Sequence, residues 1–93
     1  MHLAVQTFQL SLPGCGSRKE KRMVVKSLRE RIRHRFNVAV AETGALEVLV
    51  RAEISVAAVG GDRGTVEGVL DQVDRFVEAD GRFLIASVRR EFR

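Results

Sequence analysis

A long stretch in the middle of the chain has an apolar residue at every second position. From Leu46 to Ala58 each even position is apolar, and the odd positions include Glu47, Arg51 and Glu53. A repeat of two residues is typical of a strand that buries one face. A continuous strand starting at Leu46 would extend roughly 46 Å at the usual rise per residue, which is long for a chain of 93 residues. We therefore expect a bulge, or an early portion that projects as a hairpin.

A helix is predicted directly after this strand. Gly60 and Gly61 end the strand, and Asp62 is a residue type that caps helix N-termini. Apolar residues then recur at the i, i+3, i+4, i+7 spacing of an amphipathic helix. They are Val66, Val69, Leu70, Val73, Phe76 and Val77. The sequence Ala-Asp-Gly at residues 79–81 ends this helix.

An earlier helix is predicted after a loop that contains proline and glycine. Ser17 and Glu20 have the spacing of a capping box, in which the hydroxyl and the carboxylate bond backbone N–H groups of the first turn. The core-facing stripe of this helix consists of Val24, Val25, Leu28, Ile32 and Phe36. We expect the helix to end near Phe36, with Asn37 in the left-handed conformation that often follows a helix.

Three further segments complete the predicted secondary structure. Residues 3–12, 38–41 and 83–92 have strand-like composition, and Thr43-Gly44 offers a turn between the second and third strands. The order β-α-β-β-α-β predicts an α+β ferredoxin-like sandwich, in which a four-stranded antiparallel sheet carries two helices on one face. With 45% hydrophobic residues, the chain has enough apolar material for a single domain over residues 1–93.

Apolar residues of the opposite parity suggest a use for the sheet face that the helices leave bare. They are Leu3, Val5, Leu49, Ala57 and Val59. A half-covered sheet with apolar residues on both faces needs a second cover, and the simplest cover is another copy of the chain. The alternative is that these side chains are exposed singly, as small apolar residues often are. We expect a homodimer that pairs through this face.

Positive charge is concentrated in the first predicted helix. Residues 18–35 contain nine Lys or Arg and two Glu, whereas the other 75 residues contain seven basic and ten acidic groups. Concentrated charge on a slightly acidic body produces a local field that attracts polyanions. The alternative interpretation is a solvated helix face that keeps the protein soluble.

Five of these cations form a continuous ridge along the helix. The ridge residues are Lys19, Arg22, Lys26, Arg29 and Arg33. Their spacing of three and four residues places them within an arc of about 80°, opposite the apolar stripe. No carboxylate lies inside this arc, whereas a solvated helix usually interleaves Glu at i±4. We predict that the ridge binds RNA phosphates, with Arg18 and Lys21 as flanking contacts.

Other chemistries find little support in the sequence. The RNA-recognition motif shares the predicted fold but stacks bases on strand aromatics; the third strand here has none, and Phe8 in the first fits the core. The loop before the first helix matches neither phosphate-binding glycine motif. Acylphosphatases share the fold and use an arginine and an asparagine, but only Arg18 and Asn37 invite that comparison, without the family's loop motif. One Cys and two His form no metal-binding pattern.

Several motifs resemble the YlxP-like family of small bacterial proteins. The most specific pair is S-x-K-E-K-R at residues 17–22 and R-F-N-V at residues 35–38. Further matches lie at residues 12–14, 24–28, 39–42, 51–52, 60–63, 69–71 and 76–78. The resemblance implies a ferredoxin-like fold, cytoplasmic residence and a link to translation, because such genes often neighbour those of ribosome-maturation and initiation factors. It implies no catalytic residue. One departure is Leu49, where many relatives carry an aromatic residue shortly before Arg51.

Together these features predict a non-enzymatic, dimeric protein that associates with RNA or the ribosome, in ribosome maturation or translation. The alternative is a ferredoxin-like regulatory or ligand-binding dimer whose basic helix contacts an acidic protein. We expect no cofactor, no metal and no catalytic residue. A lone cysteine, the absence of an apolar run of the ~20 residues that span a bilayer, and an N-terminus unlike a signal peptide indicate a cytoplasmic protein.

Overall fold

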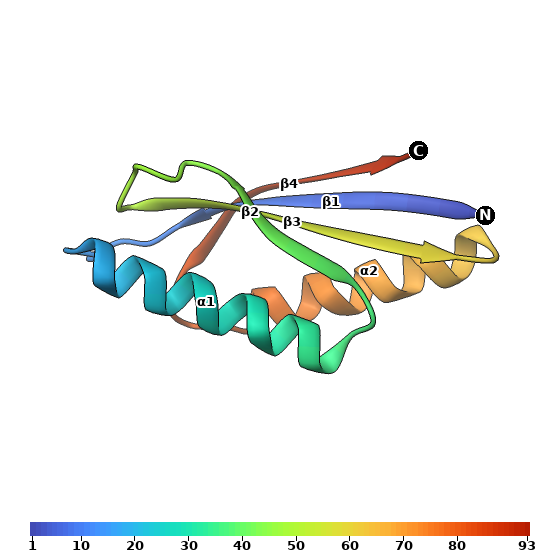
Figure 1. Cartoon of the computed structure of the whole chain (residues 1–93), viewed down its shortest axis with the longest axis horizontal. Coiled ribbons are helices and arrows are strands. Elements are labelled where there is room, and N and C mark those ends of the chain that lie inside the picture. Colours follow the sequence, from blue (N-terminus) through green and yellow to red (C-terminus); the bar gives the residue numbers. More distant parts are fainter.

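Six elements follow one another in the order that the sequence predicts. The computed structural model describes residues 1–93. The elements are β1 (His2–Ser11), α1 (Arg18–Arg35), β2 (Ala39–Gly44), β3 (Arg51–Gly60), α2 (Arg63–Glu78) and β4 (Leu84–Phe92) (Figure 1). The βαββαβ order is therefore confirmed.

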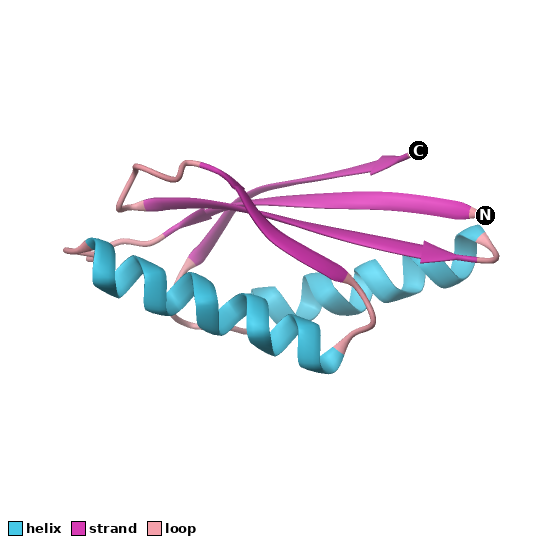
Figure 2. Ribbon diagram, in the orientation of Figure 1, coloured by secondary structure: helices cyan, strands magenta, loops and turns pink.

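The four strands form one antiparallel sheet, and both helices lie on the same face of it. The strand order is β2-β3-β1-β4, so β1 and β3 are central and the other two strands are edges. Figure 2 shows the two helices below the sheet, with the opposite sheet face uncovered. In Figure 1, α1 lies toward the viewer, on the same side as β2, and α2 lies behind α1. This arrangement confirms the predicted α+β ferredoxin-like fold.

The core fills the space between the sheet and the helices. Even-numbered residues of the two central strands point toward the helices, because successive side chains of a strand alternate between faces. Seventeen buried hydrophobic residues form one cluster. Its strand members are Ala4, Phe8, Leu10, Val40, Ala52, Ile54, Val56 and Ala58, and its helix members are Val25, Leu28, Ile32, Val66, Leu70, Val73 and Val77, with Leu12 and Phe83 from connecting segments.

Both helices begin at the residues predicted to cap them. The Ser17 hydroxyl accepts a hydrogen bond from the backbone N–H of Glu20 at 3.1 Å. The Glu20 carboxylate accepts from the N–H of Gly16 at 3.0 Å, one residue earlier than a capping box requires. At α2, Asp62 accepts from the N–H and the hydroxyl of Thr65, both at 2.8 Å. These bonds hold the pKa of Asp62 below its ordinary value.

The third strand is shorter than the alternating pattern predicts. β3 starts at Arg51, and residues 45–50 form a loop rather than strand. The predicted turn residues Thr43 and Gly44 belong to β2 instead. Ala45 has a φ of 54°, the one positive φ outside glycine, and it starts the loop. The backbone carbonyls of Ala45 and Val48 accept hydrogen bonds from Lys21 of α1, which gives these groups partners outside the sheet.

The end of α1 also differs from the prediction. The helix stops at Arg35, and Phe36 has extended backbone with a φ of −128°. Asn37 does not adopt the left-handed conformation, since Ala45 is the one non-glycine residue with positive φ. The Phe36 ring packs edge-on against Phe76 of α2, with centroids 5.7 Å apart. This contact favours an extended exit from the helix over a left-handed cap.

Candidate nucleic-acid interface

The cationic ridge of α1 forms no ion pair within the chain. Eight ion pairs are present, and none includes a ridge residue. Four ridge residues are exposed, namely Lys19, Arg22, Lys26 and Arg33. Arg29 is half-buried, and its Nε has no hydrogen-bond partner. The ridge therefore presents positive charge that no carboxylate of the chain neutralises directly.

The ridge lies on a flank of α1. The prediction that it lies directly opposite the buried side is wrong. The buried residues of the helix are Lys21, Val25, Leu28 and Ile32. At 100° per residue, the ridge is centred about 110° around the helix axis from them. It is the flank nearer β2, since Arg22 shares a pocket of about 120 Å³ with Glu42 of β2. The predicted apolar stripe is itself centred about 120° from the ridge at 100° per residue, so helix geometry alone places the ridge on a flank.

Lys21 corrects one of the predicted phosphate contacts. Its residue is 5% exposed, and its ammonium donates to the carbonyl oxygens of Ala45 at 2.6 Å and Val48 at 2.7 Å. The Glu42 carboxylate lies 3.5 Å from the same nitrogen. Two of the three donors of the ammonium thus bind backbone carbonyls, and the carboxylate balances its charge. Lys21 therefore anchors the 45–50 loop to α1 and is not available to RNA.

Arg18, the other predicted flanking residue, is exposed but partly neutralised. Its guanidinium lies 2.8 Å from the carboxylate of Glu47 in the 45–50 loop, and both side chains are well exposed. Such surface pairs are weak and are screened by salt. Arg18 can therefore exchange Glu47 for a phosphate at little cost.

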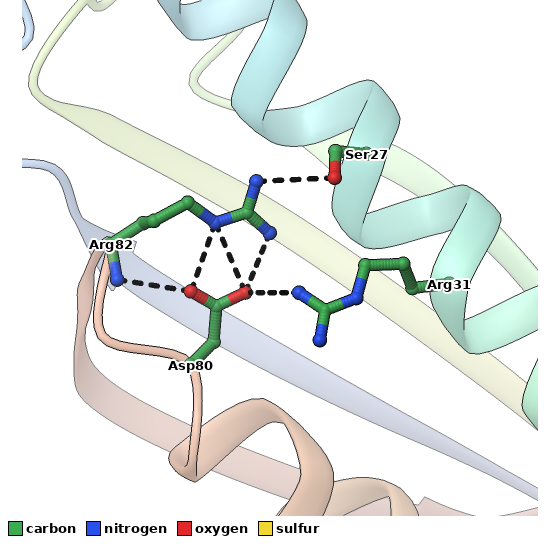
Figure 3. Close-up of polar contacts among 4 residues, drawn as sticks. All are labelled: Ser27, Arg31, Asp80 and Arg82. Atoms are coloured by element: carbon green, nitrogen blue, oxygen red, sulfur yellow. Dashed lines mark hydrogen bonds and ion pairs between the residues drawn. The ribbon is translucent and has the colours of Figure 1, made fainter.

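Beside the opposite flank of α1, two arginines share a carboxylate that comes from the turn after α2. Asp80, in the turn after α2, accepts from Arg82 at 2.6 Å and from Arg31 of α1 at 3.1 Å (Figure 3). The Arg82 guanidinium also donates to the hydroxyl of Ser27. The hydrogen bonds from Arg82 hold the pKa of Asp80 below its ordinary value, and Arg31 adds to this effect. The cluster ties α1 to the segment that leads into β4.

A groove with aromatic and cationic walls lies between α1 and α2, and sequence reasoning missed it. Its lining residues are Arg35, Phe36, Gln72, Arg75, Phe76 and Ala79. The groove has a volume of about 520 Å³, and no carboxylate lines it. Arg35 lies off the ridge, and the two rings belong to the predicted core-facing stripes of their helices, so neither feature predicted a groove. The surplus of arginine in residues 18–35 was the only signal in the sequence.

Four of the five predicted residues of the bare sheet face occupy that face. Leu3 pairs with Val59, and Val5 pairs with Ala57, all with the parity opposite to the buried core. Val59 is 64% exposed. A shallow hollow of about 300 Å³ lies at this end of the sheet, lined mainly by apolar residues. Leu49 corrects the prediction, because it belongs to the 45–50 loop and lines the pocket beside Arg22 instead.

The other end of the bare sheet face is polar. Glu53 of β3 accepts hydrogen bonds from Thr43 of β2 at 2.6 Å and from Gln9 of β1 at 2.7 Å. Together with the positive charge of Arg89, these bonds hold the pKa of Glu53 below its ordinary value. Ser55 continues the network toward Thr43 at 2.7 Å. The apolar side chains of this face are thus gathered mainly at the end that contains Leu3, Ala57 and Val59, although Leu84, which pairs with Ser11 at the polar end, is also exposed.

The structure shows neither a cluster of metal ligands nor a helix that could cross a membrane. No group of three or more His, Cys, Asp or Glu residues is arranged to hold a metal ion. Neither helix has the length and apolarity needed to cross a membrane. Cys15 is unpaired and half-buried, with its Sγ 3.6 Å from the carbonyl oxygen of Ser17.

The fold places the chain among α+β proteins with a ferredoxin-like sheet and a basic first helix. The chain belongs to the family described as "Protein of unknown function (DUF503)", whose profile matches residues 3–90. It is 36% identical over 64 residues to "Uncharacterized protein YlxP" of Bacillus subtilis (strain 168), a match that covers 69% of this chain and 70% of that protein. The resemblance to the YlxP-like family is therefore confirmed.

Proposed function

We propose that this protein is a non-enzymatic RNA-associated protein of the cytoplasm that acts at or near the ribosome. The ridge of Lys19, Arg22, Lys26, Arg29 and Arg33 is its contact with the phosphate backbone. One observation carries the proposal: these five cations share a helix flank and have no carboxylate partner. Charges that only improved solubility would more often be interleaved with acidic residues.

The dimensions of the ridge suit a polyanion better than a single anionic group. From Lys19 to Arg33 the helix rises about 21 Å at 1.5 Å per residue. This length spans several successive phosphates of a nucleic acid strand. The exposed ends of these long side chains adapt to backbone geometry, so the ridge reads charge and shape rather than base sequence.

Salt dependence gives the proposal a quantitative form. If all five ridge cations neutralise phosphates, the logarithm of the binding constant falls with the logarithm of salt concentration with a slope of about −3.5 to −4.5. A slope near zero, or no binding to ribosomal RNA at low salt, would contradict the proposal.

A matched pair of variants tests whether the ridge itself is responsible. In the first variant the four exposed ridge residues become glutamine: Lys19, Arg22, Lys26 and Arg33. In the control, four exposed arginines elsewhere become glutamine: Arg51, Arg63, Arg89 and Arg93. Both variants lose the same charge. In filter binding to ribosomal RNA, we expect the ridge variant to lose about tenfold or more in affinity and the control much less.

Thermal unfolding of both variants checks that the fold is kept. Equal losses of RNA binding in the two variants would show a general charge effect and no ridge site. Loss of binding to an acidic protein, with RNA binding unchanged, would favour the alternative in which the ridge contacts an acidic partner.

We also propose that two copies pair through the apolar end of the bare sheet face. The apolar side chains there pair across β1 and β3 rather than lying singly. Val59 is exposed, and Leu3, Val5 and Ala57 are half-buried. Pairing of this kind leaves α1 of each copy free, so a dimer would carry two ridges. Sedimentation at about tens of micromolar protein, the range of weak to moderate association, measures the oligomeric state.

A further inference from the structure

The groove between α1 and α2 brings arginine side chains close to two phenylalanine rings. The guanidinium of Arg35 lies 5.3 Å from the ring centroid of Phe76 and 5.9 Å from that of Phe36. Arg31 lies 5.1 Å from the same Phe76 ring. The two rings are perpendicular, at 80° to one another. Each ring therefore has a guanidinium group near it, and both rings also pack partly against the hydrophobic core.

Charge in the groove is not neutralised. Arg35 and Arg75 form no ion pair, and both are exposed. Arg31 is different, because it is paired with Asp80. The groove thus offers two free cations, one of them over the Phe76 ring, beside the amide side chain of Gln72.

We propose that this groove binds an unpaired nucleotide of RNA. The Arg35 guanidinium lies over the Phe76 ring and is exposed, and nucleobases stack on guanidinium planes and on aromatic rings. Arg75 is placed to contact a neighbouring phosphate, and the Gln72 amide can both donate to and accept from a base edge. An acidic peptide would use the two cations but not the planar guanidinium and phenylalanine groups. The chemistry therefore favours a nucleotide over a carboxylate ligand.

This inference rests on the proposed function and makes its substrate more specific. The ridge and the groove lie on opposite flanks of α1, so an RNA strand that crosses the helix reaches both. The ridge contacts only backbone, and backbone contacts suit paired or unpaired RNA alike. The groove accepts only a base that is free of its pairing partner. The expected ligand is therefore an RNA with an unpaired nucleotide beside the backbone that the ridge contacts, such as a duplex with an adjoining single-stranded segment.

Two RNAs separate the groove from the ridge. One is a blunt-ended hairpin whose strands are joined by a non-nucleotide linker, so that it has no unpaired base. The other is the same hairpin with an unpaired extension that carries 2-aminopurine, whose fluorescence changes on stacking. We expect the wild-type protein to bind the extended hairpin more tightly than the blunt one. The 2-aminopurine signal is expected to change on binding.

Arg35→Lys is the decisive variant, because lysine keeps the charge but has no planar group to stack. We expect it to lose about fivefold or more in affinity for the extended hairpin, in line with the loss of base stacking, and to lose the fluorescence change. Its affinity for the blunt hairpin and its salt slope are expected to stay as in the wild type. Arg63→Lys is the matched control, because Arg63 lies 4.0 Å from the Phe92 ring outside the groove.

The outcomes distinguish the two proposals. The nucleotide site is wrong, while the ridge stands, if Arg35→Lys and the wild type bind the extended hairpin equally. The same conclusion follows if polyglutamate displaces the extended hairpin from the wild type as effectively as unlabelled RNA does. If the wild type prefers the extension but the ridge variant binds as tightly as the wild type, the ridge is wrong while the groove stands. If no RNA binds, both proposals are wrong.

Discussion

The ammonium nitrogen of Lys21 lies 2.6 Å from the carbonyl oxygen of Ala45, whereas the other two lysines of α1 are exposed. The contact joins α1 to the loop between β2 and β3, 24 residues further along the chain. It holds the loop against α1 beside the ridge, where Arg18 and Arg22 share a pocket with Leu46 and Glu47.

Replacing Lys21 with methionine should destabilise the protein. Methionine fills similar volume but leaves the carbonyls of Ala45 and Val48 without their donor. Buried acceptors that lose a partner cost about 1–3 kcal/mol each in folded proteins, and partial rehydration of the loop places the total at the low end. We expect a lower unfolding midpoint in urea and faster hydrogen exchange of the amides in residues 45–50. The matched variant Lys26→Met, at an exposed site, should change stability by less than about 0.5 kcal/mol.

In RNA binding, we expect an effect of Lys26→Met and none of Lys21→Met. Lys26→Met removes one ridge cation, so the slope of log binding constant against log salt should become less steep by about 0.7 to 0.9. Lys21→Met should leave the slope unchanged, because its ammonium faces the loop and not solvent. Titrations of ribosomal RNA over a salt series measure both slopes, and an equal change in the two would contradict the assignment of roles.

Asp80 should make the stability of the fold sensitive to acid. Its pKa is lowered in the folded protein by Arg82 and Arg31, so the carboxylate stabilises the fold fully above its unfolded pKa of about 3.9. This contribution disappears as the pH falls from there through the lower, folded pKa. Asp80→Asn should therefore cost about 1–2 kcal/mol at neutral pH, toward the low end for a charge-assisted bond because the arginines are partly exposed.

The difference in stability between Asp80→Asn and the wild type should shrink below pH about 4. Urea unfolding at a series of pH values measures this difference and cancels the contributions of Asp62 and Glu53, which both proteins share. A difference that stays constant down to the lowest pH would show that the ion pairs with Arg31 and Arg82 do not stabilise the fold.

Val59→Glu should prevent pairing through the bare sheet face. The side chain is 64% exposed in the single chain, so the substitution should leave the folded monomer intact. In a dimer it would bury an unpaired carboxylate, which is costly. Sedimentation velocity should show a shift from dimer to monomer. Leu46→Glu is the control, because Leu46 is similarly exposed at 61% but lies in the 45–50 loop; dissociation in both variants would exclude this face as the interface.

Local signals in the sequence predicted most of the fold. The alternation along β3, the spacing from Val66 to Val77 and the caps Ser17 and Asp62 each depend on residues within a few positions of one another. Such short-range rules give element type and order, and the order of elements gives the sheet topology. The prediction failed where a long-range contact prevailed, as at residues 45–50, where a helix side chain binds the backbone.

The candidate site was likewise predictable from the sequence only in part. The ridge is visible in the sequence because its five members lie on one helix, and helical geometry alone brings them together. The groove is not visible, because Arg35 and Phe76 are 41 positions apart and meet only when α1 and α2 pack on the sheet. The roles of Lys19 and Lys21, two residues apart, also differ only in three dimensions, since one faces solvent and the other faces two backbone carbonyls.

The amino-acid sequence by itself determined the secondary structure, the ferredoxin-like order and the concentration of cations on the first helix. Only the tertiary structure decided which of those cations are free, where the third strand begins and which aromatic rings line a groove. The physical reason is range: periodicity and capping act over a few residues, whereas burial of a charge and its hydrogen bonding depend on partners that the fold brings from far along the chain.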